Sequence, residues 1–479
     1  MKGSLFGKLS FGAAAVIVTV LVAATILENL CGSPFAIENI YHSWWFVALW
    51  ALLAVTALIY ILRTQRRGSL ILLHASLVLV LLGAFVSFLT SKRGDIAISE
   101  DGVPASMFET SDGMLQKLPF RLLLADVDTL YTNGGETPSD YVVRVMVDDK
   151  TVQTERIISL NAPAKINGYQ FCIKGVDEAG VSLLVSYDPY GRLISYAGYA
   201  MVLISFLLLF FDGKSGFHAL LLQIKGVERK GESGKRKTCL RKITFFRSRL
   251  SPFSFHISLR IVLSVSFLFL CVLWCGHGVF PATNGAEALL LFVLFLMLLA
   301  VALGRKKRFV LLSRLLVVVA AMFFVVAVLG LDGDSSVQPI LRTPLLGIHV
   351  TTIIIAYALL ACTAVNAVVA LCTKDEKRKA QQALLGRLLL YPATVLLAGG
   401  IFIGAVWANL SWGRYWGWDP KEVWALITLL VCSVGFHPHS LRFISKPIAF
   451  HIFCIVAFAA VLFTFFGVNY LLGGLHSYA

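Results

Sequence analysis

Long apolar runs alternate along the chain with short polar segments. Eleven of these runs come close to the roughly 17–25 residues that cross the hydrocarbon core of a bilayer. They lie at residues 11–29, 44–62, 69–90, 195–211, 256–275, 286–303, 309–331, 346–372, 388–408, 422–438 and 447–472. The pattern predicts a polytopic all-α membrane protein with about eleven transmembrane helices. The first run, which follows Lys2 and Lys8, also has the features of a signal peptide.

Residues 91–194 show a different pattern. Short alternating runs such as "FRLLLADVDTLY" and "DYVVRVMVDD" are bounded by turn signals such as "NGG" and "DDK", which is typical of antiparallel strands. We therefore expect one extracytoplasmic β-rich domain between spans three and four. It contains ten Lys/Arg and fifteen Asp/Glu, no histidine and one cysteine, Cys172. Its acids are dispersed, so a scaffold or docking module is favoured over a catalytic domain.

Composition and charge fit this topology. The chain is 58% hydrophobic and 14% charged, and its net charge is +15. The basic residues gather in short loops and in the stretch 212–255, as the positive-inside rule expects of cytoplasmic loops, so nucleic-acid binding is excluded. The N-terminus is predicted to be cytoplasmic and the C-terminus extracytoplasmic. The stretch 212–255 is a basic cytoplasmic linker between a four-span half, 1–211, and a seven-span half, 256–479.

Four histidines lie in or beside the predicted spans, where an ionisable side chain indicates function by default. His74 and His437 are both expected towards the cytoplasmic side, at similar depth. His349 and His476 are both expected at the outer face. Each pair offers two imidazoles, which is what six-coordinate haem iron takes as axial ligands; copper or zinc would also suit, although no carboxylate or thiolate lies close in sequence. His451 is explained by a hydrogen bond to a neighbouring helix.

Five of the nine tryptophans lie within residues 407–424 at the outer face: Trp407, Trp412, Trp416, Trp418 and Trp424. One interpretation is an aromatic belt at the membrane surface. The other is a flat apolar platform for a porphyrin, whose propionates would meet Arg414, Arg342 or Lys421. Glycines between the indoles, which let a ligand approach closely, favour the platform.

The acidic residues of this segment have a structural explanation. "DPKE" at residues 419–422 has Asp at the N-cap, Pro at the first helical position and Glu three residues after the cap. This is a capping box. Asp419 and Glu422 are therefore predicted to cap a helix rather than to catalyse a reaction.

At these residues the sequence resembles a known family. "WGRYWGWDPKEVWALIT" is similar to the WWD motif of cytochrome c biogenesis proteins of the CcsA (ResC) type, and "LRTPLLGIHV" matches the same type. "YHSWWFVALWALLAVTAL" and "LLHASLVLVLLGAFVS" resemble its partner, CcsB (ResB). The chain thus resembles a natural CcsB–CcsA fusion, a System II synthase, with its WWD segment at 407–424. Its outer domain is short for the family, which puts contacts made through a larger domain in doubt.

The resemblance implies both a function and a set of roles. His349 and His476 would be the external axial ligands of haem held at the WWD segment, and His74 and His437 the ligands of an intramembrane site. Haem b would cross the bacterial cytoplasmic (inner) membrane and be joined by thioether bonds to the CxxCH thiols of apocytochrome c, which is the activity of a holocytochrome c synthase (cytochrome c haem lyase). Thiol-reducing proteins on the outer face and membrane lipid are the other implied partners.

Three other functions remain open from the sequence. The chain could be a haem exporter or chaperone that passes haem to a separate synthase. It could be a b-type bis-histidine electron carrier. A generic solute transporter is the third, although no inverted repeat or charged midplane site favours it.

Overall fold

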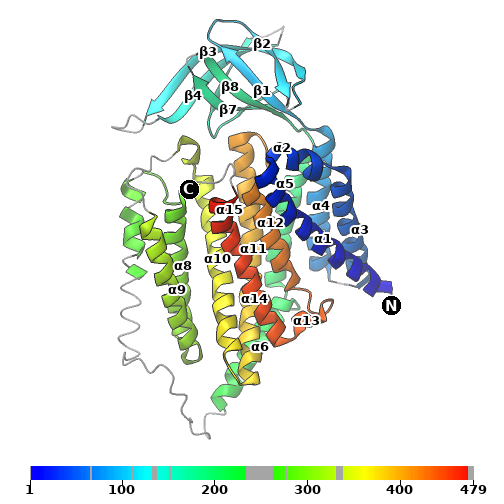
Figure 1. The fold of residues 1–479 in the computed structure, drawn as a ribbon, viewed down its shortest axis with the longest axis vertical. Helices are drawn as coiled ribbons and strands as arrows, with labels where there is room; N and C mark the ends of the chain where they lie inside the picture. Colours follow the sequence, from blue (N-terminus) through cyan, green and yellow to red (C-terminus); the bar gives the residue numbers. More distant parts are fainter. Residues whose placement is uncertain are drawn as a thin grey trace.

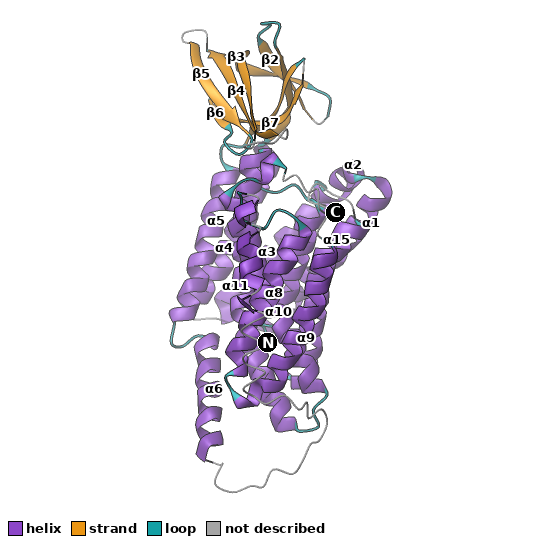
Figure 2. Cartoon of the chain, turned by 90° about the vertical axis from the view of Figure 1, so that its left-hand side faces the viewer, coloured by secondary structure: helices purple, strands orange, loops and turns teal. Residues whose placement is uncertain are grey.

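A computed structural model describes residues 2–64, 67–110, 112–131, 138–149, 153–177, 179–233, 263–264, 266–272, 274–276, 278–330 and 338–472. A helical bundle carries a sheet domain at one end, and the N-terminus lies toward the opposite end (Figure 1). Figure 2 shows all the strands gathered in that one domain and helices in the rest. The prediction of a polytopic helical protein with a β-rich insertion is confirmed.

In the described residues, the regular structure before β1 and after β8 is helical. The α-helices are α1 (Lys2–Cys31), α2 (Ser33–Ala36), α3 (Trp44–Thr64), α4 (Gly68–Thr90), α5 (Gly191–Phe211), α6 (Gly216–Ser233), α8 (Gly285–Gly304), α9 (Val310–Leu329), α10 (Pro344–Leu371), α11 (Glu376–Trp412), α12 (Pro420–Val434), α13 (Arg442–Ser445), α14 (Pro447–Leu462) and α15 (Val468–Leu471). Short 3-10 or π segments are η1 (Ile37–Tyr41), η3 (Lys307–Phe309), η4 (Pro339–Leu341) and η5 (Phe463–Gly467).

Within the described residues, nine helical segments are long and apolar enough to cross a membrane. They correspond to nine of the eleven predicted spans. The predicted span 256–275 lies largely outside the described residues. The predicted span 422–438 is the helix α12, which has only 15 residues because Pro420 starts it and Gly435 follows its end. That is shorter than the roughly 20 residues that cross the hydrocarbon core, so the prediction was too long here.

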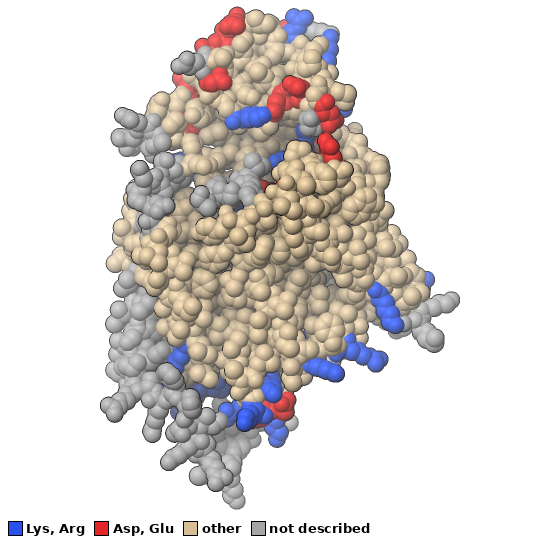
Figure 3. Space-filling view, viewed as in Figure 1, with Lys and Arg blue, Asp and Glu red and all other residues tan. Residues whose placement is uncertain are grey.

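Charged side chains lie at the two ends of the molecule. In the space-filling view, the sheet domain carries Lys, Arg, Asp and Glu, and the opposite end carries mostly Lys and Arg (Figure 3). The visible surface between the two ends is almost uncharged. A membrane would cover such a band, because charged groups avoid the hydrocarbon core. The sheet domain and the basic end therefore face opposite sides of the membrane.

The sheet domain is a single antiparallel sheet of eight strands in the order β5-β4-β3-β2-β1-β8-β7-β6. The strands are β1 (Lys92–Ser99), β2 (Ala105–Thr110), β3 (Leu115–Tyr131), β4 (Pro138–Asp148), β5 (Gln153–Ser159), β6 (Ala164–Ile166), β7 (Tyr169–Asp177) and β8 (Gly180–Tyr187). Alternate residues, such as Val143, Val145 and Val147 of β4, fill one apolar core. Ser159 at the end of β5 bridges to Ala162 before β6, so the sheet curls back towards itself.

Helix packing positions the end of the bundle that lies next to the sheet domain. The helix α10 is central and packs against α8, α11 and α14. The helices α4 and α5 approach closely because glycine removes side chains between them: a Cβ atom on Gly83 would lie 2.5 Å from the Ser195 nitrogen. Small residues allow this approach in membrane helices. In the same way Ser87 of α4 lies against Gly191 of α5, and both Ser87 and Ser195 are buried.

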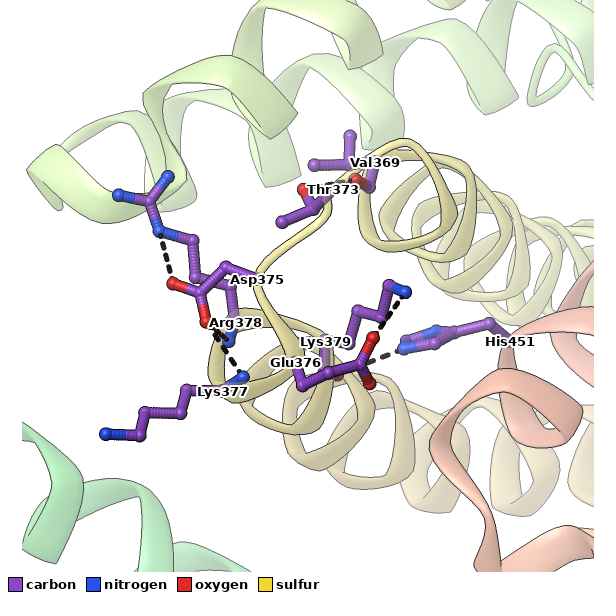
Figure 4. Close-up of polar contacts among 8 residues, drawn as sticks. All are labelled: Val369, Thr373, Asp375, Glu376, Lys377, Arg378, Lys379 and His451. Carbon is purple, nitrogen blue, oxygen red and sulfur yellow. Dashed lines mark hydrogen bonds and ion pairs between the residues drawn. The ribbon is translucent and has the colours of Figure 1, made fainter. Parts of the chain in front are cut away.

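His451 is used structurally at the basic end of the bundle. Its ring lies fully buried on α14, and Nε2 is 3.1 Å from the carbonyl oxygen of Lys379 on α11. Figure 4 shows the ring directed at the first turn of α11, where the Asp375 side chain caps the helix and accepts a hydrogen bond from the Lys377 N–H (2.9 Å). This contact ties α14 to α11, as the sequence predicted for this histidine.

Candidate functional site

The tryptophan segment, residues 407–424, comprises the end of α11, a loop and the start of α12, and it lies beneath the sheet domain (Figure 1). The helix α11 ends at Gly413, whose φ of 68° is the left-handed conformation that suits glycine at a helix C-terminus. Trp418 also has a positive φ, 59°, which is strained for a bulky residue. Two unusual backbone positions therefore frame residues 414–417.

Asp419 and Glu422 form the capping box at the start of α12. The Lys421 N–H donates to Asp419 Oδ2 (3.1 Å), and the Asp419 N–H donates to Glu422 Oε2 (3.3 Å). Glu422 Oε2 also accepts a hydrogen bond from the Gly417 N–H (2.8 Å). The two carboxylates thus fix the loop backbone as well as the helix start.

A cavity opens beside this segment, between α8, α10, α11 and α12. The space between its walls is about 1160 Å³, part of it open to solvent. Aliphatic and aromatic side chains make most of the wall, and His349, Trp407, Tyr415 and Trp416 are among them. A mostly apolar wall with a few polar groups is typical of sites for small molecules and cofactors.

His349 is held in one orientation in the cavity wall. Its Nδ1 lies 2.7 Å from the carbonyl oxygen of Gly400, which requires the proton on Nδ1 and leaves the lone pair on Nε2. Its ring lies against Gly404: a Cβ atom there would come within 2.5 Å of His349 Cε1. An imidazole fixed by a carbonyl through one nitrogen is the usual arrangement of a metal-ligating histidine.

The five indoles of the segment do not form one platform. Only Trp407 and Trp416 line the cavity. Trp412 packs edge-on against Trp407, with ring centroids 4.8 Å apart. Trp418 stacks on Tyr41, at 4.6 Å between centroids and 6° between planes. Trp424 contacts Phe463 at 4.0 Å and donates to the Thr25 hydroxyl (3.2 Å). Two indoles are therefore available to a ligand in the cavity, and two anchor the segment to the first helices of the chain.

Tyr415 ties the segment to α4 and α5. Its hydroxyl lies 2.8 Å from the Ser87 Oγ and accepts a hydrogen bond from the Ser195 hydroxyl (3.2 Å). Ser87 in turn donates to Asp188 Oδ2 (2.5 Å). Burial raises the pKa of Tyr415, which the two serine hydrogen bonds partly offset, so the phenol stays protonated.

Positive charge gathers on the side of the segment that faces the sheet domain. The Arg414 guanidinium lies over Gly417, where a Cβ atom would come within 2.9 Å of it. Arg93, at the start of β1, is close enough that burial and then the charge of Arg414 lower its pKa. Lys421 lines the cavity and donates to Asn469 (2.9 Å). These cations could meet the carboxylates of a ligand.

The second histidine pair lies deeper in the bundle. The rings of His74 on α4 and His437, just after α12, have centroids 6.3 Å apart and are nearly perpendicular. Each Nδ1 lies 2.9 Å from a carbonyl oxygen four residues earlier, Leu70 for His74 and Ser433 for His437. The structure therefore brings these two histidines together from distant parts of the chain. His476, the predicted outer partner of His349, lies outside the described residues.

Several residues of the site carry no signal in the sequence. Tyr41, Ser87, Asn161 and Gln170 each contact the tryptophan segment or the turn before it, yet no local motif marks them. Their roles depend on contacts with residues more than 200 positions away. Only an approach that places distant segments together could have found them.

Comparison with known proteins assigns two regions of the chain. The family described as "Cytochrome C assembly protein" matches residues 282–476, and the family described as "ResB-like family" matches residues 63–192. These matches include the tryptophan segment in the first case and His74 with the sheet domain in the second. The residues between them contain the predicted linker 212–255.

Individual relatives agree with the family matches. The protein NrfI of Wolinella succinogenes is 35% identical over 154 residues, which are 30% of this chain and 17% of the relative. The cytochrome c biogenesis protein CcsA of Chlamydomonas reinhardtii is 36% identical over 155 residues, or 30% of this chain and 43% of the relative. CcsA of Manihot esculenta is 46% identical over 86 residues, or 18% and 26%. The matched stretch is thus less than half the length of each relative.

Proposed function

Because the chain is a ResB–CcsA fusion and belongs to the cytochrome c biogenesis proteins, we propose that it transports haem b across a bacterial cytoplasmic membrane and attaches it to apocytochrome c. The proposed activity is that of a holocytochrome c synthase. The proposed orientation places the N-terminus in the cytoplasm and the sheet domain and tryptophan segment outside. The basic end opposite the sheet domain supports this orientation through the positive-inside rule (Figure 3).

The outer cavity is the proposed site of attachment. His349 is the proposed axial ligand on one side of the iron, and His476 the proposed ligand on the other. Trp407 and Trp416 would contact the porphyrin plane, and Arg414 would pair with a propionate. The proposal is supported by the apolar wall, by the fixed tautomer of His349 and by Gly404, which leaves room for its ring.

The inner pair, His74 and His437, is the proposed site where haem is taken up from the cytoplasmic side. Two imidazoles that bind one metal ion from opposite sides have ring centroids about 6 Å apart, from two metal–nitrogen bonds of about 2 Å and the ring radii. The observed separation of 6.3 Å is close to this value. Both rings also leave the lone pair on Nε2, because each Nδ1 faces a carbonyl oxygen.

The proposed reaction is the addition of a thiol across a vinyl group. The sulfur of each CxxCH cysteine bonds to the vinyl carbon next to the ring, and the thiol hydrogen ends on the terminal carbon, so the step consumes no oxidant or reductant. The thiols must be reduced beforehand, which is the role of thiol-reducing proteins on the outer face. The chain's contribution is to hold haem and peptide together, which alone accelerates a two-component reaction greatly.

The observation that carries the proposal is the cavity at the outer end, lined by His349 and two indoles within the cytochrome c assembly region. A haem exporter that hands its cargo to a separate synthase would use the same cavity. The two functions differ in whether the chain alone yields a covalent product.

The deciding experiment uses a bacterium that lacks its own cytochrome c maturation genes. The full chain is expressed there with a secreted CxxCH reporter, and covalent haem is detected on the reporter after denaturing electrophoresis. We expect a haem-stained band, and no band with an AxxAH reporter. If folded, haem-loaded protein gives no covalent product with reduced reporter, the synthase function is wrong and the exporter function remains.

A further inference from the structure

The strand β7 of the sheet domain contacts the last turn of α11, which is part of the tryptophan segment. Gln170 on β7 is completely buried there. Its Nε2 donates to the carbonyl oxygen of Asn409 (2.5 Å). Its Oε1 accepts hydrogen bonds from Arg192 (2.8 Å) and from Asn409 Nδ2 (3.4 Å). A single side chain of the ResB-like region thus holds the end of a helix in the cytochrome c assembly region.

Asn161, in the turn between β5 and β6, makes a second link. Its Oδ1 accepts a hydrogen bond from the Ser411 hydroxyl (2.8 Å), and its Nδ2 donates to the carbonyl oxygen of Ile340 (3.1 Å). Ser411 belongs to the last turn of α11, which leads to Trp416. Ile340 belongs to η4, which leads into α10 and His349. Asn161 therefore joins the two segments that lead to His349 and Trp416, both of which line the cavity.

Cys172 fills the space between these two links. Its Sγ lies 3.7 Å from the Leu410 carbonyl oxygen, and only 1% of the residue is exposed. Gly413 lies beside it: a Cβ atom there would be in van der Waals contact with Sγ at 3.5 Å and would crowd Ser186 Cβ at 3.3 Å. The last carbonyl groups of a helix have no partners within the helix. Here Cys172 on β7 supplies a partner for the Leu410 carbonyl, and Gln170 adds a second hydrogen bond to the Asn409 carbonyl, which also accepts the Gly413 N–H.

We propose that Asn161 and Gln170 are positioning residues of the outer haem site, and that the sheet domain acts as a clamp that sets the distance between His349 and the tryptophan segment. The inference rests on the proposed function for what occupies the cavity, but the clamp itself is independent of it. The sheet domain then has a direct part in haem handling, although it contributes no ligand.

The experiment compares Asn161→Ala and Gln170→Ala with Gln153→Ala in the full-length protein. Gln153 is an exposed glutamine on β5 of the same domain and serves as the matched control. Two measurements are made on each purified protein. The first is the rate of alkylation of Cys172 by N-ethylmaleimide, followed by mass spectrometry of its peptide. The second is the visible absorption spectrum and the electron paramagnetic resonance spectrum of the haem-loaded protein.

We expect Cys172 to be alkylated roughly tenfold faster in both clamp variants, because a buried hydrogen-bonded link that restrains opening is lost. We also expect the spectrum of the outer haem to change while that of the inner haem does not. Asn161→Asp keeps the acceptor for Ser411 but places a carboxylate oxygen against the Ile340 carbonyl oxygen, so its alkylation should be at least as fast as that of Asn161→Ala. It also provides a test if the alanine variants do not fold.

Two outcomes would overturn the inference. Unchanged alkylation in the clamp variants would mean that these side chains do not hold the sheet domain against α11. Faster alkylation with an unchanged spectrum of the outer haem would mean that the contact between the sheet domain and α11 does not affect how the haem is positioned. Absence of outer haem from the wild-type protein would instead contradict the proposed function, while the alkylation rates would still report on the clamp.

Discussion

The outer and inner histidine sites are built in opposite ways. His74 and His437 are each fixed by their own helix or turn, through a carbonyl oxygen four residues earlier in the chain. His349 is fixed by Gly400, which is on a different helix, and its cavity is completed by segments held from the sheet domain. The orientation of each inner ring is set within its own helix or turn, whereas the orientation of His349 and the shape of its cavity depend on contacts with other elements. The outer site should therefore be the easier of the two to disturb from a distance.

The largest effect is expected from Gly404→Leu. Any side chain at this position overlaps the ring of His349, so the imidazole must leave its place against Gly400. Haem content should fall by about half, with loss of the outer haem and retention of the inner haem. Haem per protein measured by the pyridine haemochrome method tests this. Gly399→Ala is the control, because its Cβ atom would meet only the end of the Leu203 side chain at 3.4 Å. Equal haem content in both variants would show that His349 is not a ligand.

The converse test removes the inner pair. His74→Ala should abolish binding of the inner haem and leave the tautomer of His349 and the outer cavity as they are, since no described contact joins the two sites. The spectrum of haem-loaded protein should lose the inner component, and added imidazole should restore it. If His74→Ala also removes haem loaded directly at the outer site, the two sites are coupled and the comparison above fails.

A smaller difference is expected between two tryptophans of the segment. Trp416→Ala removes an indole from the cavity wall and should weaken outer haem binding roughly tenfold, as expected for loss of one large aromatic contact. Trp424→Ala removes contacts with Phe463 and Thr25 and should lower the thermal unfolding temperature with less effect on haem affinity. Haem titration and thermal unfolding of both variants separate the two roles.

The smallest effect concerns the reactivity of Cys172. Burial raises the pKa of this thiol to about 11, so below that pH the group stays almost wholly in its unreactive protonated form. In folded protein its alkylation should keep rising up to about pH 11, whereas in urea it should level off near the ordinary value of about 8.5. If the alkylation rate of folded protein levels off near pH 8.5, Cys172 is not buried between β7 and α11.

Much of the architecture could be predicted from the sequence because it depends on local patterns. Apolar length predicts nine described spans, strand alternation predicts the sheet domain, and "DPKE" predicts the helix cap that Asp419 and Glu422 make. The meeting of His74 and His437 follows from equal depth in the membrane.

Which indoles line the cavity and which pack against other helices could not be predicted from local patterns. Five tryptophans close in sequence suggested one surface, but a loop with two positive φ angles turns successive side chains in different directions. Trp418 then meets Tyr41, and Trp416 meets the cavity. The same holds for Asn161 and Gln170, whose neighbours are set by how the sheet domain sits on the bundle. Tertiary placement, and not local preference, decides these roles.

The short length of α12 bears on the distance that haem would move between the two proposed sites. This helix begins in the tryptophan segment and ends at Val434, directly before Gly435 and three residues before His437, so its length separates the proposed outer and inner sites. Its 15 residues span about 22 Å at the α-helical rise of about 1.5 Å per residue, against a hydrocarbon core of about 30 Å. In the proposed transport, haem would therefore pass between the two sites through less than the full thickness of the hydrocarbon core.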